Sequence, residues 1–515
     1  MYRQNIIRDT FGVTRSGKVK NIEDSFKKFF TDEVSTTIIK NTNKHMGLND
    51  RSIDKRELFA FIGILYMMGT NQDNDLSITD LWSEMNGRPF YKGAMARNRF
   101  VHILKHLRFD DAATRTKRRK KDKFAPIRNV FQMVTSTFSS NFKPYQCTTI
   151  DEMLSLYRGR CPFKVFMKDK PGKYGILIRM LTDSHKRYVI NMEPYAGKTN
   201  EISNKPKDIV CRLAQTIEGT SRNITMDRFY SSVELADELW HKFQLTVVGT
   251  MQVNRKHIPE IMKISKNREL YSSIFLFSKV TTATAPVTLV SYNHKPKKVL
   301  IFISTQHQTI GDFEGEKKKP EINLFYNDTK GGVDTIDQLT RHYTTKRGTF
   351  RWPLSIFYTL LDIIGVNAFT LFLECFPDWG KQNPNKRKLF LRELALCLVK
   401  PYVSQRNTSN LHKDVVFGIH SILHEKTSSD SSSPSSLATK TRAAAATTSI
   451  ATTQSMAVKR GRCKICYDKA FDYASKQKAS RIGTKCYKCR IYVCKVHSCM
   501  NIVCEMCGES SDISD

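Results

Sequence analysis

The sequence predicts a multi-domain α/β protein, in which a mixed α/β core lies between an all-helical region and a cysteine-rich C-terminal segment. Three observations support this class. Apolar residues follow a helical period through residues 19–146, β-branched runs alternate with helical patterns from residue 147, and eight of the 13 cysteines lie after residue 462. With 515 residues, 40% of them hydrophobic, the chain has the length of about three domains.

The charge balance favours a polyanionic partner. Lys and Arg number 83 against 49 Asp and Glu, which gives a formal net charge of +34. Nucleic acid is the first expectation and an anionic membrane the second, with a merely soluble basic protein as the alternative. No apolar leader opens the sequence, and the longest apolar stretch, residues 354–376, contains Asp362, Asn367 and Glu374. We therefore expect an intracellular, soluble protein in which this stretch is a buried helix and not a membrane span.

The segments can be assigned in chain order. The predicted boundaries are 1–18 for a disordered tail, 19–146 for the helical region, 147–251 for the first part of the core, 252–320 for a small β insertion with an isolated hairpin, 321–343 for the second part of the core, 344–424 for further helices, 425–456 for a Ser/Thr/Ala-rich flexible linker and 457–508 for the cysteine-rich domain. A basic run, Arg115–Lys121, is either a solvated loop or a segment for nuclear import or phosphate contact.

The core is predicted from its strands and the acids that follow them. A β-branched run leads into Asp151, and further strands are expected at Tyr174–Leu181, Tyr188–Met192, Asn223–Met226 and Leu245–Thr250. Asp227 directly follows Met226, and Ser231 with Glu234 predicts a capping box that opens the next helix. Asp334 and Asp337 follow two glycines and share one face of a later helix.

This order of strands, helices and acids predicts a ribonuclease-H-like core. Cutting or joining phosphodiesters can use two hard cations about 3.5–4 Å apart, and Mg²⁺ prefers carboxylate oxygens. Asp151, Asp227 and Asp334 are the candidate ligands, with Asp337 one turn along the helix. From the pattern alone, these acids could equally be caps or salt-bridge partners.

The cysteine-rich segment predicts two structural zinc ions. Its ligand pairs alternate, which favours a cross-braced finger. One set is Cys463, Cys466, Cys494 and His497, and the other is Cys486, Cys489, Cys504 and Cys507. Cys499 is left over and could replace a neighbouring ligand.

Several separated motifs carry a family resemblance. They are Ile150–Glu152 with Tyr157–Phe163, Lys170–Ile176, Asn223–Asp227, Thr329–Gln338, Phe350–Pro353 and the Cys/His cluster. Together they resemble the piggyBac transposase family over about residues 20–508. The resemblance implies a DDE/D transposase with Asp151, Asp227 and Asp334 as ligands of two Mg²⁺ ions (or Mn²⁺) and Asp337 as a supporting fourth acid.

The resemblance also implies a reaction and its partners. The reaction is cut-and-paste transposition, with hairpin-forming excision from terminal inverted repeats and integration at TTAA, by a nuclear homodimer. Residues 19–146, together with 344–424, would then serve dimerisation and DNA binding.

Candidate DNA contacts follow from the same resemblance. Trp352 is a candidate platform for an unpaired base, with an ordinary core tryptophan as the alternative. Further candidates are Arg351 beside it, Arg255 and Lys256 near the start of the insertion, and Lys485, Lys488 and Arg490 in the zinc finger. Some relatives have a basic residue where Gln252 stands, a departure that bears on target capture.

Two other functions stay open. A domesticated descendant would bind DNA or chromatin without cutting it, and a cross-braced finger also occurs in ubiquitin ligases. The intact acids favour the transposase.

Overall fold

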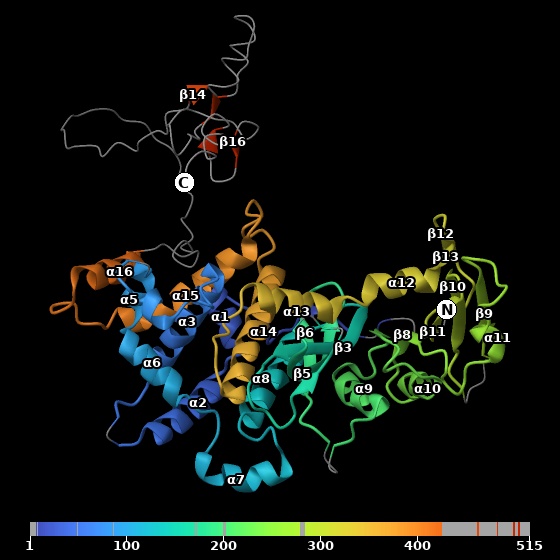
Figure 1. The fold of residues 1–515 in the computed structure, drawn as a ribbon, viewed down its shortest axis with the longest axis horizontal. Helices are drawn as coiled ribbons and strands as arrows, with labels where there is room; N and C mark the ends of the chain where they lie inside the picture. Colours follow the sequence, from blue (N-terminus) through green and yellow to red (C-terminus); the bar gives the residue numbers. More distant parts are fainter. Residues whose placement is uncertain are drawn as a thin grey trace, which may run out of the picture. The chain divides into compact units, whose positions relative to one another are not determined.

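The computed structural model describes residues 7, 9–48, 50–85, 87–168, 170, 172–198, 202–278 and 284–424, with four residue pairs between 461 and 504. The chain divides into two compact units, Met1–Ser433 and Pro434–Asp515. The first unit has a mixed α/β fold, as the sequence predicts, and its helical part and its sheet are visible in Figure 1.

The helical part begins with eight helices. They are α1 (Ile22–Lys27), α2 (Asp32–Met46), α3 (Lys55–Asn71), α4 (Ile78–Leu81), α5 (Pro89–Ala94), α6 (Arg97–His106), α7 (Ala112–Lys121) and α8 (Arg128–Asn141), with β1 (Gly12–Val13) paired to β2 (Phe142–Lys143). The side chains of Asn21, Thr31 and Asp54 cap α1, α2 and α3 by accepting backbone N–H bonds.

The basic run forms helix α7, so the solvated-loop interpretation is wrong in its structure. No residue of α7 is buried. Two of its arginines bind the carboxylate of Asp110, Arg115 at 2.5 Å and Arg118 at 2.6 Å. Pairing with this buried acid fixes the helix at its start and leaves its remaining cations at the surface.

The central sheet has nine strands. They are β3 (Cys147–Leu156), β4 (Val165–Phe166), β5 (Tyr174–Asp183), β6 (Val189–Pro194), β7 (Asn223–Met226), β8 (Thr246–Met251), β9 (Ser273–Phe277), β10 (Thr288–Lys295) and β11 (Lys298–Ser304). The order is β4-β5-β3-β7-β8-β11-β10-β9, and β6 pairs with β5. Strand β3 is antiparallel to β5 and parallel to β7, which is parallel to β8.

The predicted isolated hairpin is part of this sheet. Strand β11 pairs antiparallel with β8, with Ile301 opposite Met251 and Ser304 opposite Val248. Strand β8 would otherwise expose unpaired backbone groups along one edge, and β11 satisfies them. The insertion therefore continues the core sheet. It also contains α11 (Glu260–Lys263) and the strand pair β12 (Phe313–Glu314) and β13 (Lys319–Pro320).

Two helices connect the strands of the core. Helix α9 (Pro206–Ala214), continued by the 3₁₀ turn Gln215–Ile217, lies between β6 and β7, and α10 (Val233–His241) between β7 and β8. The N-cap of α10 is Ser232, whose Oγ accepts from the N–H of Leu235, so the predicted cap at Ser231 is wrong by one residue. Ser231 donates instead to the carbonyl of Asp227 at 2.9 Å.

The last five helices return to the first ones. They are α12 (Glu321–Thr329), α13 (Gly332–His342), α14 (Trp352–Cys375), α15 (Lys386–Val403) and α16 (Lys413–His424). Helix α15 packs along α3 and α16 along α5, so orange and blue segments lie side by side in Figure 1. Residues far apart in sequence therefore share the helical part of the first unit.

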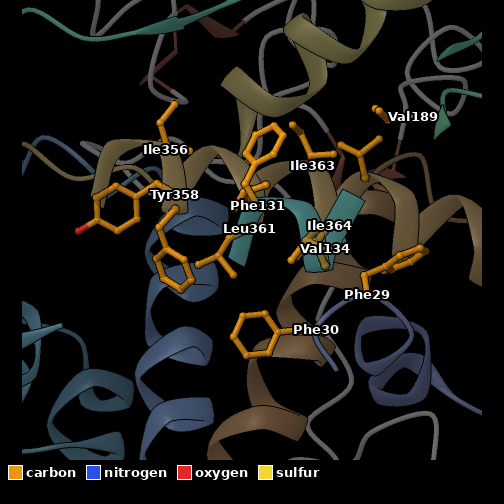
Figure 2. Close-up of a cluster of buried hydrophobic side chains, with 14 of the residues drawn as sticks. Phe29, Phe30, Phe131, Val134, Val189, Ile356, Tyr358, Leu361, Ile363 and Ile364 are labelled. Carbon is orange, nitrogen blue, oxygen red and sulfur yellow. The ribbon is translucent and has the colours of Figure 1, made fainter. Parts of the chain in front are cut away.

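Helix α14 is the centre of the hydrophobic core. Among the described residues, it is the one helix long and apolar enough to span a membrane, but 89% of its apolar window is buried inside the protein, as predicted. Its buried Asn367 has a partner there, because it exchanges two hydrogen bonds with the backbone of Val189, at 2.9 and 3.0 Å. Figure 2 shows Ile356, Leu361 and Ile364 of α14 among Phe29, Phe30, Phe131 and Val134. One core thus supports both the helices and the sheet.

The C-terminal unit is described only at four short strands. Strand β14 (Gly461–Arg462) pairs with β15 (Arg481–Ile482), and β16 (Ser498–Cys499) pairs with β17 (Val503–Cys504). Of the predicted zinc ligands, only Cys504 falls on a described segment, and the others lie outside the described residues. The predicted contacts Lys485, Lys488 and Arg490 lie outside them as well.

Candidate active site

The first two predicted acids lie side by side where strand β7 ends. In the parallel pair of β3 and β7, Ile150 is opposite Met226, so the next residue on each chain is Asp151 or Asp227. Strand β3 continues to Leu156, whereas the chain turns away from the sheet after Met226. The Asp227 carboxylate accepts from the N–H of Phe229 at 2.9 Å, which fixes it at the start of that turn. The sheet therefore presents two carboxylates at one edge.

Helix α13 brings the third acid to the same strand. Its first residue, Gly332, lies against β3 and β5, where an added Cβ would be 2.5 Å from Oγ1 of Thr182 and 2.7 Å from Oγ1 of Thr149. Only glycine permits this approach. Thr149 also donates to the carbonyl of Thr329 at 2.6 Å, which holds the end of α12 against the sheet. Asp334, in the first turn of α13, is consequently carried to β3, and its carboxylate is exposed.

A lysine ammonium group lies among these acids. Lys170 Nζ is 3.5 Å from Oδ1 of Asp334 and donates to the carbonyl of Glu152 at 3.2 Å. It therefore joins the third acid to strand β3, next to the first acid. The sequence placed Lys170 in a motif but gave no reason to assign this lysine to the site, because it lies on a different loop.

Burial of the acids disfavours their charged forms in the absence of a cation. Burial raises the pKa of Asp151 to about 7, and the Glu152 side chain adds to the shift. Burial also raises the pKa of Asp227, with a contribution from the charge of Asp151. A group of carboxylates with raised pKa values is the arrangement that a bound cation would stabilise.

The fourth predicted acid, Asp337, forms an ion pair with an arginine. Asp337 is buried, and Arg341 binds both of its carboxylate oxygens, at 2.9 and 2.8 Å. Burial raises the pKa of Asp337, while Arg341 and Lys170 act in the opposite direction. Such a bidentate pair leaves few lone pairs for a metal, so Asp337 supports the helix that carries Asp334.

Glu152 also has a hydrogen-bond partner, in the turn that follows β7. Its Oε1 accepts from the hydroxyl of the buried Tyr230 at 2.5 Å, in the turn that follows Asp227. The pair ties the end of β7 to β3 and helps to fix the spacing of the first two acids.

Comparison with known proteins identifies the family. A family model described as "Transposase IS4" matches residues 23–369, more than half of the chain. A solved structure described as "Cryo-EM structure of piggyBac transposase synaptic complex with hairpin DNA" is similar over 97% of this chain and 100% of that chain, with a TM-score of 0.75 and 31% identity. The chain belongs to the piggyBac transposase family.

Two human proteins of the piggyBac family are more distant relatives. Over 373 residues the chain is 21% identical to "PiggyBac transposable element-derived protein 2", covering 68% of this chain and 62% of that protein. Over 382 residues it is 22% identical to "PiggyBac transposable element-derived protein 3", covering 67% and 60%. The chain thus spans less than two thirds of the length of these relatives.

Two of the DNA contacts implied by the piggyBac resemblance have internal roles in this structure. Trp352 is 7% exposed and packs against Phe163 and Phe124, with ring centroids 5.0 and 5.6 Å away, so its faces are not open to a base. Arg351 donates to the carbonyls of Leu104, Lys105 and Leu107 at the C-terminus of α6. A cation stabilises this end of a helix, and burial lowers the pKa of Arg351 to about 10.

The exposed aromatic residue of the same motif is Phe350. The residue is 96% exposed, while its carbonyl accepts from the hydroxyl of Tyr157 at 2.6 Å. Its backbone is therefore held by Tyr157, directly after β3, on one side and by the half-buried Arg351 and the buried Trp352 on the other. Sequence alone could not show which of two aromatic residues, two positions apart at the start of α14, is exposed.

One of the two basic residues at the start of the insertion, Arg255, lies near the second acid. Arg255 donates to the carbonyl of Phe229 at 3.0 Å, in the turn after Asp227, and Lys256 is exposed. Arg255 is thus held beside the turn that follows Asp227, and its contact with DNA stays a prediction.

The raised pKa of Asp151 predicts a pH-dependent stability. Asp151 is protonated up to about pH 7 in the folded, Mg²⁺-free protein but only to about pH 4 when unfolded, so its stabilising contribution is complete below pH 4 and is lost as the pH rises through 7. Asp151→Asn should therefore increase the free energy of unfolding at pH 8 more than at pH 5, by on the order of 2 kcal/mol. Urea denaturation at both pH values measures this difference.

The matched control is Asp378→Asn, at a side chain that is 82% exposed. We expect it to change stability equally at both pH values. An equal effect of Asp151→Asn at pH 5 and pH 8 would contradict the description of this carboxyl group.

Proposed function

We propose that this protein is an active DNA transposase, in which Asp151, Asp227 and Asp334 bind two Mg²⁺ ions and carry out phosphodiester hydrolysis and strand transfer. The observation that carries the proposal is the meeting of Asp151 and Asp227 at the end of β7 with Asp334, which α13 brings against β3. The three acids come from distant parts of the chain, and burial disfavours the charged forms of Asp151 and Asp227 in the absence of a cation.

The order of strands supports a ribonuclease-H-like core. From β6 through β5, β3, β7 and β8, three antiparallel strands are followed by two strands parallel to β3. Along the chain these strands come in the order β3, β5, β6, β7 and β8. This chain order is the one that the sequence predicts for a nuclease core, with Asp151 on the first strand and Asp227 after the fourth. The similarity to a structure described as a transposase synaptic complex with hairpin DNA favours the same function.

The donor groups suit Mg²⁺. All three are carboxylates, which are the ligands that Mg²⁺ prefers, and the Lys170 ammonium already lies beside one of them as a stand-in cation. Bound there, two Mg²⁺ ions would hold the attacking and leaving oxygens in line and neutralise the developing charge. Asp151 and Asp227 would be held by the sheet, and Asp334 by the Asp337–Arg341 pair one turn along its helix.

A cationic cleft beside Asp334 suits the DNA backbone. The cavity has a volume of about 700 Å³, and its lining includes Lys170, Arg187, Arg341 and Arg387 together with Asp334. Guanidinium and ammonium groups next to the acids can hold phosphates on either side of the bond that is cut. Zinc binding by the cysteine-rich unit, a homodimer, terminal repeats and TTAA as substrates, and a nuclear location belong to the same proposal.

A DNA cleavage assay tests the proposal. The full chain, incubated with transposon-end DNA and Mg²⁺, should nick the DNA strand, and Asp151→Asn, Asp227→Asn or Asp334→Asn should each lower the rate at least ~100-fold, because each removes a ligand of the reacting metals. Asp328→Asn, next to α13 and 71% exposed, is the matched control and should cleave normally. Specific DNA binding without cleavage by the wild type would favour the domesticated DNA-binding protein instead.

Phe350 replaces Trp352 as the proposed platform for an unpaired base. Its exposed ring can stack on a base at ~1–3 kcal/mol, so Phe350→Ala should weaken binding to DNA with unpaired bases roughly 5- to 150-fold. Binding to a fully paired duplex should change much less, and Phe350→Trp should retain affinity. Fluorescence anisotropy with both DNAs measures the effect.

Phe417→Ala is the control for this loss of an exposed ring, because Phe417 is 64% exposed on α16. If Phe350→Ala binds DNA with unpaired bases as tightly as the wild type does, Phe350 is not a platform for an unpaired base.

A further inference from the structure

A second cluster of potential metal ligands lies in the helical region, on elements that carry none of the acids above. His102 and His106 are one turn apart on α6, and Asp50 lies in the loop that follows α2. His45, in the last turn of α2, lies against His106. Imidazole and carboxylate are the ligands of zinc and similar ions, and a pair of histidines four residues apart on a helix faces one side.

The donor atoms lie at the spacing of a metal site. Nε2 of His102 is 3.4 Å from Oδ1 of Asp50, and one ligand atom from each of Asp50, His102 and His106 lies within 4.8 Å of the other two. Four ligands at 2.0–2.2 Å from a tetrahedral zinc ion are about 3.3–3.6 Å apart. A small contraction would therefore bring the three side chains to one ion.

Hydrogen bonds connect the residues that follow Asp50 to α2 and to α6. The Asn43 side chain exchanges two hydrogen bonds with the backbone of Ile53, at 2.8 and 2.9 Å, which ties the loop to α2. Arg99 of α6 donates to the carbonyls of Arg51 and Ser52, both at 2.8 Å. The ligands are therefore held on a framework that costs little to organise, and this favours binding.

Charged side chains surround the imidazoles of the cluster. The neutral ring is the form that binds a metal. Several cations face the cluster: Arg99, which is paired with Glu57 at 2.6 Å, Arg108, which donates to Nε2 of His45 at 2.6 Å, Lys105 near His106, and Arg115 and Arg351 near His45.

We propose that Asp50, His102 and His106 bind a Zn²⁺ ion, with water as the fourth ligand. Two imidazoles favour zinc and related transition metals over Mg²⁺, so this site would be separate in its metal chemistry from the three acids. Nδ1 of His45 lies 3.2 Å from Nδ1 of His106, so His45 packs beside the proposed site. The ion would link the loop after α2 to α6, whose C-terminus Arg351 caps.

The test is the zinc content of the full-length protein. After equilibrium dialysis against Zn²⁺, plasma mass spectrometry should find one zinc ion fewer per chain in Asp50→Asn, His102→Gln and His106→Ala than in the wild type. All variants keep the C-terminal cysteines, so any zinc bound there cancels in the difference. The Co²⁺ difference spectrum between the wild type and His106→Ala should contain d–d bands and no thiolate charge-transfer band, because both proteins have the same cysteines.

His420→Ala is the matched control. His420 and His424 are also four residues apart on one helix, α16, with ring centroids 5.9 Å apart, but they do not belong to a three-ligand group among the described residues. It should keep the zinc content of the wild type. Equal zinc content in the wild type and all three ligand variants would overturn the proposal, whatever the outcome of the cleavage assay.

Discussion

The parallel pairing of β3 with β7 is the constraint on which the candidate active site depends. It sets Ile150 opposite Met226 and thereby places Asp151 beside Asp227 at the point where one strand ends and the other continues. A shift of register by one residue would turn every side chain of a strand to the other face and separate the two carboxylates. Buried threonines strengthen the pairing, since Oγ1 of Thr148 donates to the carbonyl of Asn223 at 2.8 Å.

The rest of the first unit holds this register in place. Helix α12 ends in hydrogen bonds to Thr149 and Thr225, and Gly332 lets α13 lie directly on the sheet, so the third acid depends on the same two strands. The buried Asp362 of α14 accepts hydrogen bonds from Thr344 and Thr345, which ties the chain before the helix to the core. A closely packed core of this kind resists small displacements, which suits a site that must hold three carboxylates in fixed positions.

Local patterns predicted much of this arrangement. A β-branched run followed by an acid is visible in sequence, so the strands before Asp151 and Asp227 were placed correctly, as was the helix that carries Asp334. Pairings between distant segments were less accessible. Nothing in the sequence of the hairpin Thr288–Ser304 indicates that it pairs with β8, and this pairing is visible only in the structure.

Exposure was the other quantity that sequence could not supply. Phe350 and Trp352 are two residues apart, yet only Phe350 faces solvent. Trp352 is buried because it packs against Phe124 and Phe163, which lie far earlier in the chain. The same holds for Arg351, whose positive charge suggested a phosphate contact but whose partners are carbonyls at the end of α6. The Arg341–Asp337 pair, by contrast, is local, at i and i+4, and could have been predicted.

The most direct test of the central claim is a count of the metal ions held by the three acids. Mn²⁺ added to the full-length protein with transposon-end DNA should give the electron paramagnetic resonance spectrum of a magnetically interacting pair, because two ions in such a site lie about 3.5–4 Å apart. Asp227→Asn should abolish the pair signal. A spectrum of isolated Mn²⁺ ions, unchanged by Asp227→Asn, would show that Asp151, Asp227 and Asp334 do not form one two-metal site.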